Sequence, residues 1–127
     1  MSLKVTIEEK DKGSFRVIPS GSLDTATYTI LEDKLKPVLS SSPRVLVFDM
    51  AGITYISSLG LNTMIKTRKA LQEMNGTLII TNLRPQVKKV FDIVEALPNM
   101  NVFESIEEAD AYLSRMQQDE IDRRGSA

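Results

Sequence analysis

The sequence has 127 residues, of which 42% are hydrophobic and 26% charged, and its formal net charge is -1. This length suits one domain around a single core, and the charge gives no long-range attraction to nucleic acid or to an anionic membrane. The absence of cysteine and histidine excludes disulfides, Cys/His zinc sites and Ser-His or Cys-His nucleophile pairs. Because the apolar runs are shorter than the roughly 20 residues of a membrane-spanning helix, we expect a soluble, cytoplasmic protein.

The first elements predicted along the chain are two β-strands in a hairpin. The stretches "LKVTIEEK" and "SFRVIPSGSL" alternate apolar and polar residues, and "KDKG" separates them. Proline has no N–H to donate to a neighbouring strand, so Pro19 predicts an edge strand or a bulge.

A helix, a buried strand and a second helix are predicted next. The stretch "DTATYTILEDKLKPVL" has apolar residues near helical spacing, with Asp24 or Thr25 as a candidate N-cap and Pro37 as a point of fraying or kinking. The nearly continuous apolar run "VLVFDM" is typical of a strand buried on both faces. The stretch from Ile53 to Lys69 begins like a strand and ends like a helix, which "NGT" terminates.

The last third of the chain predicts a strand in "TLIITN", a helix in "RPQVKKVFDIVEAL", a short strand in "NVFE" and a helix in "SIEEADAYLSRM". Ser105 and Glu108 have the spacing of a capping box. The order predicts an α/β fold, a mixed sheet of about five strands with about four helices packed on it. We expect a domain over residues 1–116 and a polar tail over 117–127 that frays. The predicted core consists of Val45, Val47, Leu61, Ile65, Leu71, Leu78 and Ile80.

Two serines lie where the strand of "ITYI" passes into the second helix. Ser57 has the position of an N-cap, and Ser58 then takes the first helical position with its hydroxyl outward. One reading is that the pair only caps the helix. The other is that one serine accepts a phosphoryl group, since a helix N-terminus offers free N–H groups and a positive dipole end to phosphate. A nucleophile elbow is the competing enzyme reading, but "SSLGL" is not Gly-x-Ser-x-Gly and no histidine is present to activate the hydroxyl.

Two motifs resemble the STAS domain, a family shared by bacterial anti-sigma factor antagonists and sulfate transporter tails. The turn "LDTAT" is similar to the family's Leu-Asp-x-x-Thr/Asn turn, and "YISSLGL" is similar to its aromatic-apolar-Asp-Ser-Ser/Thr-Gly-Leu loop. The later stretch "GTLIITNLRPQVKKVFDIVEAL" resembles the family's Pro-x-Val before a Phe-rich helix. The resemblance runs from about Val5 to Met116 and implies a regulator that is not an enzyme, with no cofactor.

In the antagonists of this family, a serine or threonine just before the loop glycine is phosphorylated by an anti-sigma factor that is also a kinase. This chain has Leu59 at that acceptor position, Ser58 one place earlier, and Ser57 where the family has aspartate. Either the acceptor has moved to Ser58, with Ser57 as the alternative, or the switch is lost and the domain binds its partner constitutively.

The resemblance also implies a docking surface for the kinase, which would have a histidine-kinase-like ATPase fold and supply the ATP. Asp24 corresponds to the family aspartate across the groove from the phosphorylation loop, and we expect Asp24 and Ser58 at the same end of the sheet. Arg68 falls inside the apolar stripe of the second helix, so we expect its stem along apolar surface at the rim of a binding face and its charged head in water. A phosphate-binding role is the alternative. The partner-binding residues implied are Asp24, Thr25, Ser57, Ser58, Leu59, Gly60 and Asn62. The main rival is an unphosphorylated scaffold subunit of a stressosome-like or lipid-transport complex.

Overall fold

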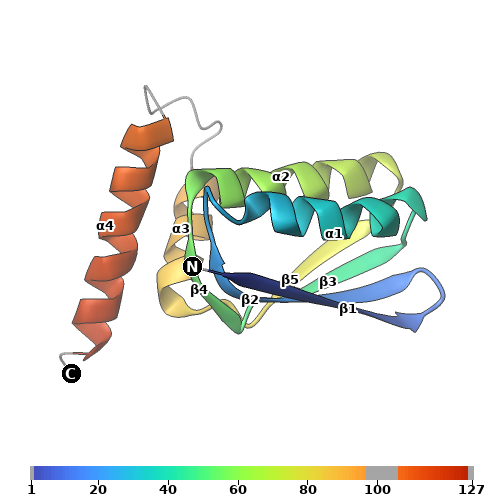
Figure 1. The fold of residues 1–127 in the computed structure, drawn as a ribbon, viewed down its shortest axis with the longest axis horizontal. Helices are drawn as coiled ribbons and strands as arrows, with labels where there is room; N and C mark the ends of the chain where they lie inside the picture. The colour runs from blue at the N-terminus through green and yellow to red at the C-terminus, as the bar shows by residue number, and fades with distance from the viewer. Residues whose placement is uncertain (1, 97–105, 126–127) are drawn as a thin grey trace.

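The computed structural model of this protein describes residues 2–96 and 106–125. It contains five strands in one mixed sheet and four helices, which confirms the predicted α/β fold (Figure 1). The predicted strand "NVFE" and Ser105 of the predicted capping box lie outside the described residues. The elements are β1 (Leu3–Asp11), β2 (Ser14–Leu23), α1 (Tyr28–Ser40), β3 (Val45–Asp49), β4 (Gly52–Ile56), α2 (Ser58–Glu73), β5 (Thr77–Thr81), α3 (Pro85–Ala96) and α4 (Ile106–Gly125).

Strand β2 is the longest strand and organises the sheet. It pairs antiparallel with β1 along one side, as the predicted hairpin requires. Along its other side the first half of β2 pairs with β3 and the second half with β4, both in parallel. Strand β5 then extends the sheet beyond β3, also in parallel. The carboxyl ends of β2 and β4 therefore lie side by side.

Pro19 is neither in an edge strand nor at a bulge, so that prediction was wrong. Its strand has neighbours on both sides, and Pro19 faces Val5 of β1 in register. On the other side, pairing with β3 stops at Val17 and pairing with β4 begins at Ser20. Proline is tolerated because it lies where the partner of β2 changes, so its missing N–H interrupts neither ladder.

Helices α1 and α2 lie on one face of the sheet (Figure 1). The β3 side chains on that face, Leu46 and Phe48, are completely buried. Val45 and Val47, predicted as core, are only half-buried because they alternate onto the other face, where the neighbouring Ile79 is 43% exposed. The strand is therefore covered on one face rather than on both.

The rest of the predicted core lies between the sheet and these helices. Leu61 and Leu71 of α2 are buried, as predicted. Ile65, Leu78 and Ile80 are partly buried and pack against the core. Helix α1 continues past Pro37 to Ser40 and begins after Thr27, which makes no side-chain capping hydrogen bond.

The C-terminal helix α4 stands at one end of the sheet, next to α3 and β4 (Figure 1). It runs from Ile106 to Gly125, so residues 117–125 are helical rather than the frayed tail expected from their polarity. The reason is that Gln117 and Glu120 are buried, 1% and 2% exposed, against the rest of the domain. Among the described helices, none combines the length and the apolar character that a membrane span requires.

Candidate functional site

The two motifs singled out in the sequence meet at the end of the sheet where β2 and β4 finish. Leu23 pairs with Ile56 as the last residue of each strand, and the Ser57 N–H donates to the Leu23 carbonyl at 2.9 Å. A Cβ added to Gly60 would lie 2.6 Å from that same carbonyl oxygen, so the first turn of α2 approaches β2 as only glycine allows. Asp24 and Ser58 therefore lie at the same end of the sheet, as predicted.

Ser57 caps helix α2, as the sequence predicted. Its backbone is extended and its side-chain oxygen accepts the Gly60 N–H at 3.2 Å. The residue is only 2% exposed. Ser57 thus satisfies one of the free N–H groups of the first helical turn and is closed to an approaching enzyme.

Ser58 takes the first position of α2, but its hydroxyl does not point freely outward as expected. It donates to the Asp110 carboxylate of α4 at 2.7 Å, and the Ser58 N–H donates to the same Oδ1 atom at 2.8 Å. A carboxylate at a helix N-terminus is favourable, because it meets free N–H groups and the positive end of the dipole. The start of α2 is therefore an anion-accepting position, and a side chain distant in sequence fills it.

Asp24 organises the turn that precedes α1. Its carboxylate accepts hydrogen bonds from the Ser22 hydroxyl at 2.9 Å, the Thr27 hydroxyl at 3.0 Å and the Ala26 N–H at 3.0 Å. Burial alone would raise the pKa of this carboxyl, but the hydrogen bonds from Ser22, Thr27 and Ala26 together lower the pKa below its usual value. Asp24 caps this turn rather than α1 itself and adds a negative charge to this end of the domain.

The remaining predicted contact residues differ in how accessible they are. Thr25 is exposed, and its hydroxyl reaches Asp110 at 3.5 Å, the long limit of a hydrogen bond. Leu59 is half-buried, Gly60 is buried and Asn62 is exposed. Thr25, Leu59 and Asn62 can therefore be reached by a protein partner, while Gly60 only permits close packing.

Sequence reasoning missed the contribution of α4 to this site. Besides Asp110, the Gln117 amide accepts from the Ile56 N–H at 3.0 Å and donates to the Ile56 carbonyl at 2.8 Å. The Tyr55 and Ser114 hydroxyls are 2.6 Å apart. The helical spacing of Asp110, Ser114 and Gln117 was the available signal, but polar residues at that spacing ordinarily face solvent.

A shallow groove runs between the sheet end and α4. It continues the surface formed by Asp24 and the strand ends. Most of the residues that line it have polar side chains, but the lining surface itself is mostly carbon. The lining residues are Ser22, Asp24, Thr54 and Tyr55 on the sheet side and Ser114, Gln117, Gln118 and Ile121 on α4.

Arg68 borders a different hollow, between α2, β5 and α3. Its side chain is exposed, yet it lines a cavity with Met64, Ile65 and Leu78. This fits the prediction that its stem lies along apolar surface while its charged head reaches water.

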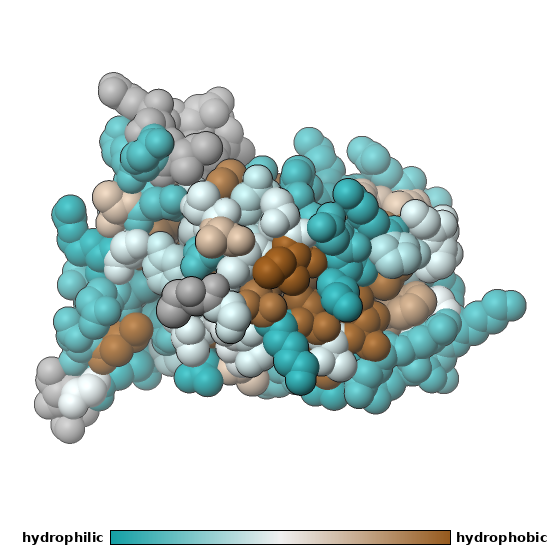
Figure 2. Space-filling view, in the orientation of Figure 1, coloured by the Kyte–Doolittle hydropathy of each residue, from teal (hydrophilic) through white to brown (hydrophobic). Residues whose placement is uncertain are grey.

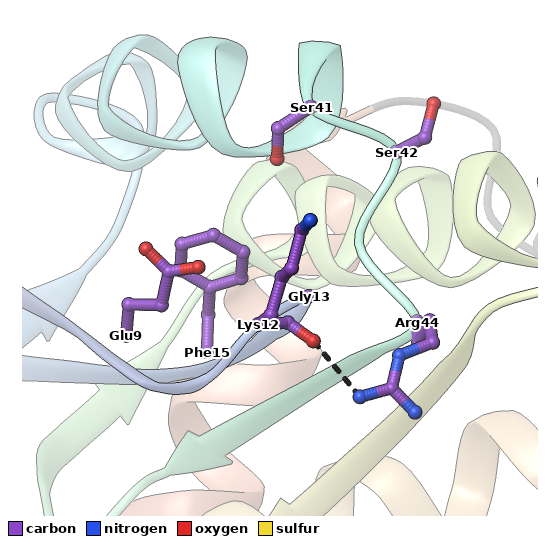
Figure 3. Close-up of a pocket in the computed structure, with 7 residues that line it drawn as sticks. All are labelled: Glu9, Lys12, Gly13, Phe15, Ser41, Ser42 and Arg44. Carbon is purple, nitrogen blue, oxygen red and sulfur yellow. Dashed lines mark hydrogen bonds between the residues drawn. The ribbon is translucent and has the colours of Figure 1, made fainter.

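Another hollow lies at the hairpin turn and the end of α1 (Figure 3). Its charged side chains include both Glu9 and the cations Lys12 and Arg44, and the Arg44 guanidinium donates to the Lys12 carbonyl at 2.8 Å. It contains none of the site residues that were predicted from the sequence.

Within residues 2–96 and 106–125, no group of acidic side chains could hold a metal ion.

Comparison with known proteins connects this geometry to a family. The family model for the STAS domain matches residues 7–109. The putative anti-sigma factor antagonist BtrV of Bordetella bronchiseptica is 31% identical over 109 residues, which cover 86% of this chain and 93% of that protein. The anti-sigma-B factor antagonist of Staphylococcus aureus is 28% identical over 107 residues, covering 84% and 98%.

A similar fold is found in SpoIIAA, an anti-sigma factor antagonist from Bacillus with structures of both an unphosphorylated and a phosphorylated form. The unphosphorylated form superposes with a TM-score of 0.62 at 16% identity, covering 71% of this chain and 83% of SpoIIAA. At that identity the likeness concerns the fold. Since the family model matches most of its length, the chain belongs to the STAS domain family.

Proposed function

We propose that this protein is an anti-sigma factor antagonist that binds a kinase-type anti-sigma factor through the end of the sheet where Asp24, Thr25 and Ser58 meet. The observation that carries the proposal is the convergence of the two motifs, "LDTAT" and "YISSLGL", on one accessible surface. Similarity to BtrV and to the anti-sigma-B factor antagonist supports the same role. In this role the protein is a regulator and catalyses nothing itself.

Ser58 is the phosphoacceptor in this proposal. Ser57 is buried and its oxygen caps α2, whereas Ser58 is half-buried at the helix start. In the reaction the Ser58 oxygen bonds to the γ-phosphorus of ATP, the bond from that phosphorus to the bridging oxygen breaks, ADP leaves, and the hydroxyl proton passes to a base of the kinase. The fold tolerates the product because a helix N-terminus favours phosphate.

The switch is electrostatic. Phosphate adds about -1.5 to -2 charges to a surface that already carries the Asp24 and Asp110 carboxylates. A kinase partner brings the phosphates of its own nucleotide to this interface, and like charges facing each other across an interface cost several kcal/mol. Phosphorylated protein is therefore released by its partner.

A second candidate function is that of a STAS scaffold subunit, which binds its partners without phosphorylation. The observation that favours it is Leu59, which occupies the position where the family's acceptor hydroxyl is expected and is half-buried here. In this role Leu59 is a packing contact in a permanent complex, and a charge at Ser58 weakens binding without regulating it.

The docking surface can be tested by calorimetric titration with a purified kinase-type anti-sigma factor from the same organism. We expect Ser58→Ala to bind like wild type, and Ser58→Asp to bind at least about tenfold more weakly, because of like-charge repulsion at the interface. Ser42→Asp is the matched control: it adds the same charge at an exposed serine in the hollow of Figure 3 and should leave affinity unchanged. Equal affinity of Ser58→Asp and Ser42→Asp would contradict the proposed surface.

A further inference from the structure

Helix α4 is attached to the proposed docking end through one polar stripe. Asp110 bonds to the start of α2, Ser114 meets Tyr55 of β4, and Gln117 bonds to the backbone of Ile56. One further turn along, the 1% exposed Glu120 side chain pairs with Lys89 of α3 at 3.3 Å. The attachment thus begins directly at Ser58 and continues along the strand that leads to it.

Gln117 takes the place that another strand could occupy. Among the described residues β4 pairs with no strand other than β2, and side chains cover its outer edge instead: Gln86 of α3 donates to the Thr54 carbonyl at 3.1 Å. The Gln117 amide satisfies both the N–H and the carbonyl of Ile56, at 3.0 Å and 2.8 Å. Unpaired backbone groups at a strand edge bind other chains readily, and here a side chain of the same molecule covers them.

Among its described side chains, α4 makes its apolar contacts through the buried Ala109 and Leu113, at 5% and 1% exposure, and through the partly buried Met116. The visible surface of α4 is mostly hydrophilic, with an apolar side chain showing toward its C-terminal end, while apolar side chains gather over the region of α1 and β1 (Figure 2). Water can replace polar contacts when they open, so elements held in this way are among the first to detach from a domain.

From these contacts we infer that α4 is an autoinhibitory strap, which covers the Ser58 end and is displaced by negative charge on Ser58. Asp110 Oδ1 lies 2.7 Å from the Ser58 oxygen and accepts its proton in a hydrogen bond. A phosphoryl group, or a carboxylate at position 58, removes that donor and places a second anion against Asp110. The anion at position 58 is covalently attached, so the strap is the part that leaves.

The coupling works in both directions: if negative charge on Ser58 weakens the docking of α4, then docked α4 disfavours negative charge on Ser58 by the same free energy. While α4 is docked, it holds the Ser58 hydroxyl and covers part of the surface proposed for the partner. A partner that needs this surface binds only the fraction of molecules in which α4 is released, so its apparent affinity is reduced by that fraction. This consequence depends on the proposed function, in which repulsion of the partner by a charge on Ser58 outweighs the uncovering of the surface. The displacement of α4 does not depend on the proposed function.

Hydrogen exchange read by mass spectrometry tests the displacement without any partner. Ser58→Asp should speed exchange of the amides in residues 106–125 by about tenfold or more, since charge-assisted hydrogen bonds are lost and like charges meet. Ser58→Asn introduces a neutral side chain of the same size as aspartate, and its exchange in α4 should stay near that of wild type. In the double variant Ser58→Asp with Asp110→Asn, much of the protection of α4 should return.

Amides of α1 and β3 provide the internal reference, and their exchange should not change in any of these variants. Unchanged protection of α4 in Ser58→Asp would overturn the inference, and so would equal loss in Ser58→Asp and Ser58→Asn. If Ser58→Asp also speeds exchange in α1 and β3, the comparison of wild type with Gln117→Ala is used to test whether α4 opens separately. Gln117→Ala should then speed exchange of α4 alone, and loss of protection across the whole domain would show that α4 is not a separable strap.

A titration with the anti-sigma factor separates this inference from the proposed function. Gln117→Ala should bind the partner several-fold more tightly than wild type, because the strap no longer competes. Weaker or equal binding, with α4 released in the exchange experiment, would overturn autoinhibition. If no variant binds while the exchange result holds, the proposed partner is wrong and the coupling between Ser58 and α4 stands.

Discussion

Ser58 is the first residue of α2 and bonds to α4, but different forces hold these two helices in place. Helix α2 buries the large apolar side chains of Leu61, Met64 and Leu71 against the sheet. Helix α4 buries Leu113 together with the polar Gln117 and Glu120. The apolar attachment belongs to the core, and its loss unfolds the domain. We expect the polar attachment to open and close while the core remains folded, which is what a regulatory element requires.

The largest effect expected is loss of core packing on α2. Leu71→Ala should lower the free energy of unfolding by about 2–5 kcal/mol, because a completely buried leucine leaves a cavity. Leu113→Ala should cost less in global stability, since the loss cannot exceed the docking energy of α4, but it should speed hydrogen exchange in α4. Urea unfolding together with exchange measures both. Equal global losses in the two variants would break the distinction between the helices.

A smaller and local effect is expected from Gln117→Ala. Loss of the amide leaves the Ile56 N–H and carbonyl without a partner, which typically costs about 1–3 kcal/mol for a buried group. The Ile56 amide should exchange faster, as measured by NMR. The adjacent Gln118→Ala is the control, because Gln118 is exposed and bonds to Asp122 within the same helix. If Gln118→Ala has the same effect, the edge contact of Gln117 is unimportant.

The two serines sharpen the comparison within α2. Ser57→Ala should destabilise the domain by about 1 kcal/mol, because the Gly60 N–H loses its cap. Ser58→Ala keeps that cap and loses only the hydroxyl contact to Asp110, so its melting temperature should fall less. Thermal unfolding of the two variants and of wild type measures these differences in melting temperature. A larger fall in melting temperature for Ser58→Ala than for Ser57→Ala would show that Ser58, and not Ser57, is the cap.

The smallest effect concerns pH and the turn at Asp24. Hydrogen bonds from Ser22, Thr27 and Ala26 outweigh burial and keep the pKa of Asp24 in the folded protein below its ordinary value of 3.8. Ionised Asp24 therefore contributes stability that is present above pH 3.8 and is lost as pH falls through the lowered pKa. The stability advantage of wild type over Asp24→Asn, measured by urea unfolding, should shrink between pH 7 and about pH 3. A constant difference would contradict this.

Much of the fold could be predicted because it depends on local patterns. Alternating apolar residues predicted the hairpin of β1 and β2, and helical spacing predicted α2 with Leu61 and Leu71 in the core. Val45 and Val47 were predicted wrongly, because a short apolar run does not reveal whether one or both faces of a strand are covered.

The site was predicted in part. The position of Asp24 and Ser58 at one end follows from parallel strands, whose carboxyl ends share an edge of the sheet. Asp110 and Gln117 could not be predicted, because their partners Ser58 and Ile56 are 52 and 61 residues away in the chain. A polar residue near the C-terminus is ordinarily solvated, and only the fold shows which ones are buried.

The claim that Ser58 is the regulated residue is tested most directly by intact-mass measurement after incubation with the kinase-type anti-sigma factor and ATP. The kinase must first be shown to phosphorylate a known substrate. We predict that wild type gains one phosphoryl group and that Ser58→Ala gains none. Equal uptake by wild type and Ser58→Ala would place the acceptor elsewhere, and no uptake by either would contradict the switch and favour the constitutive scaffold.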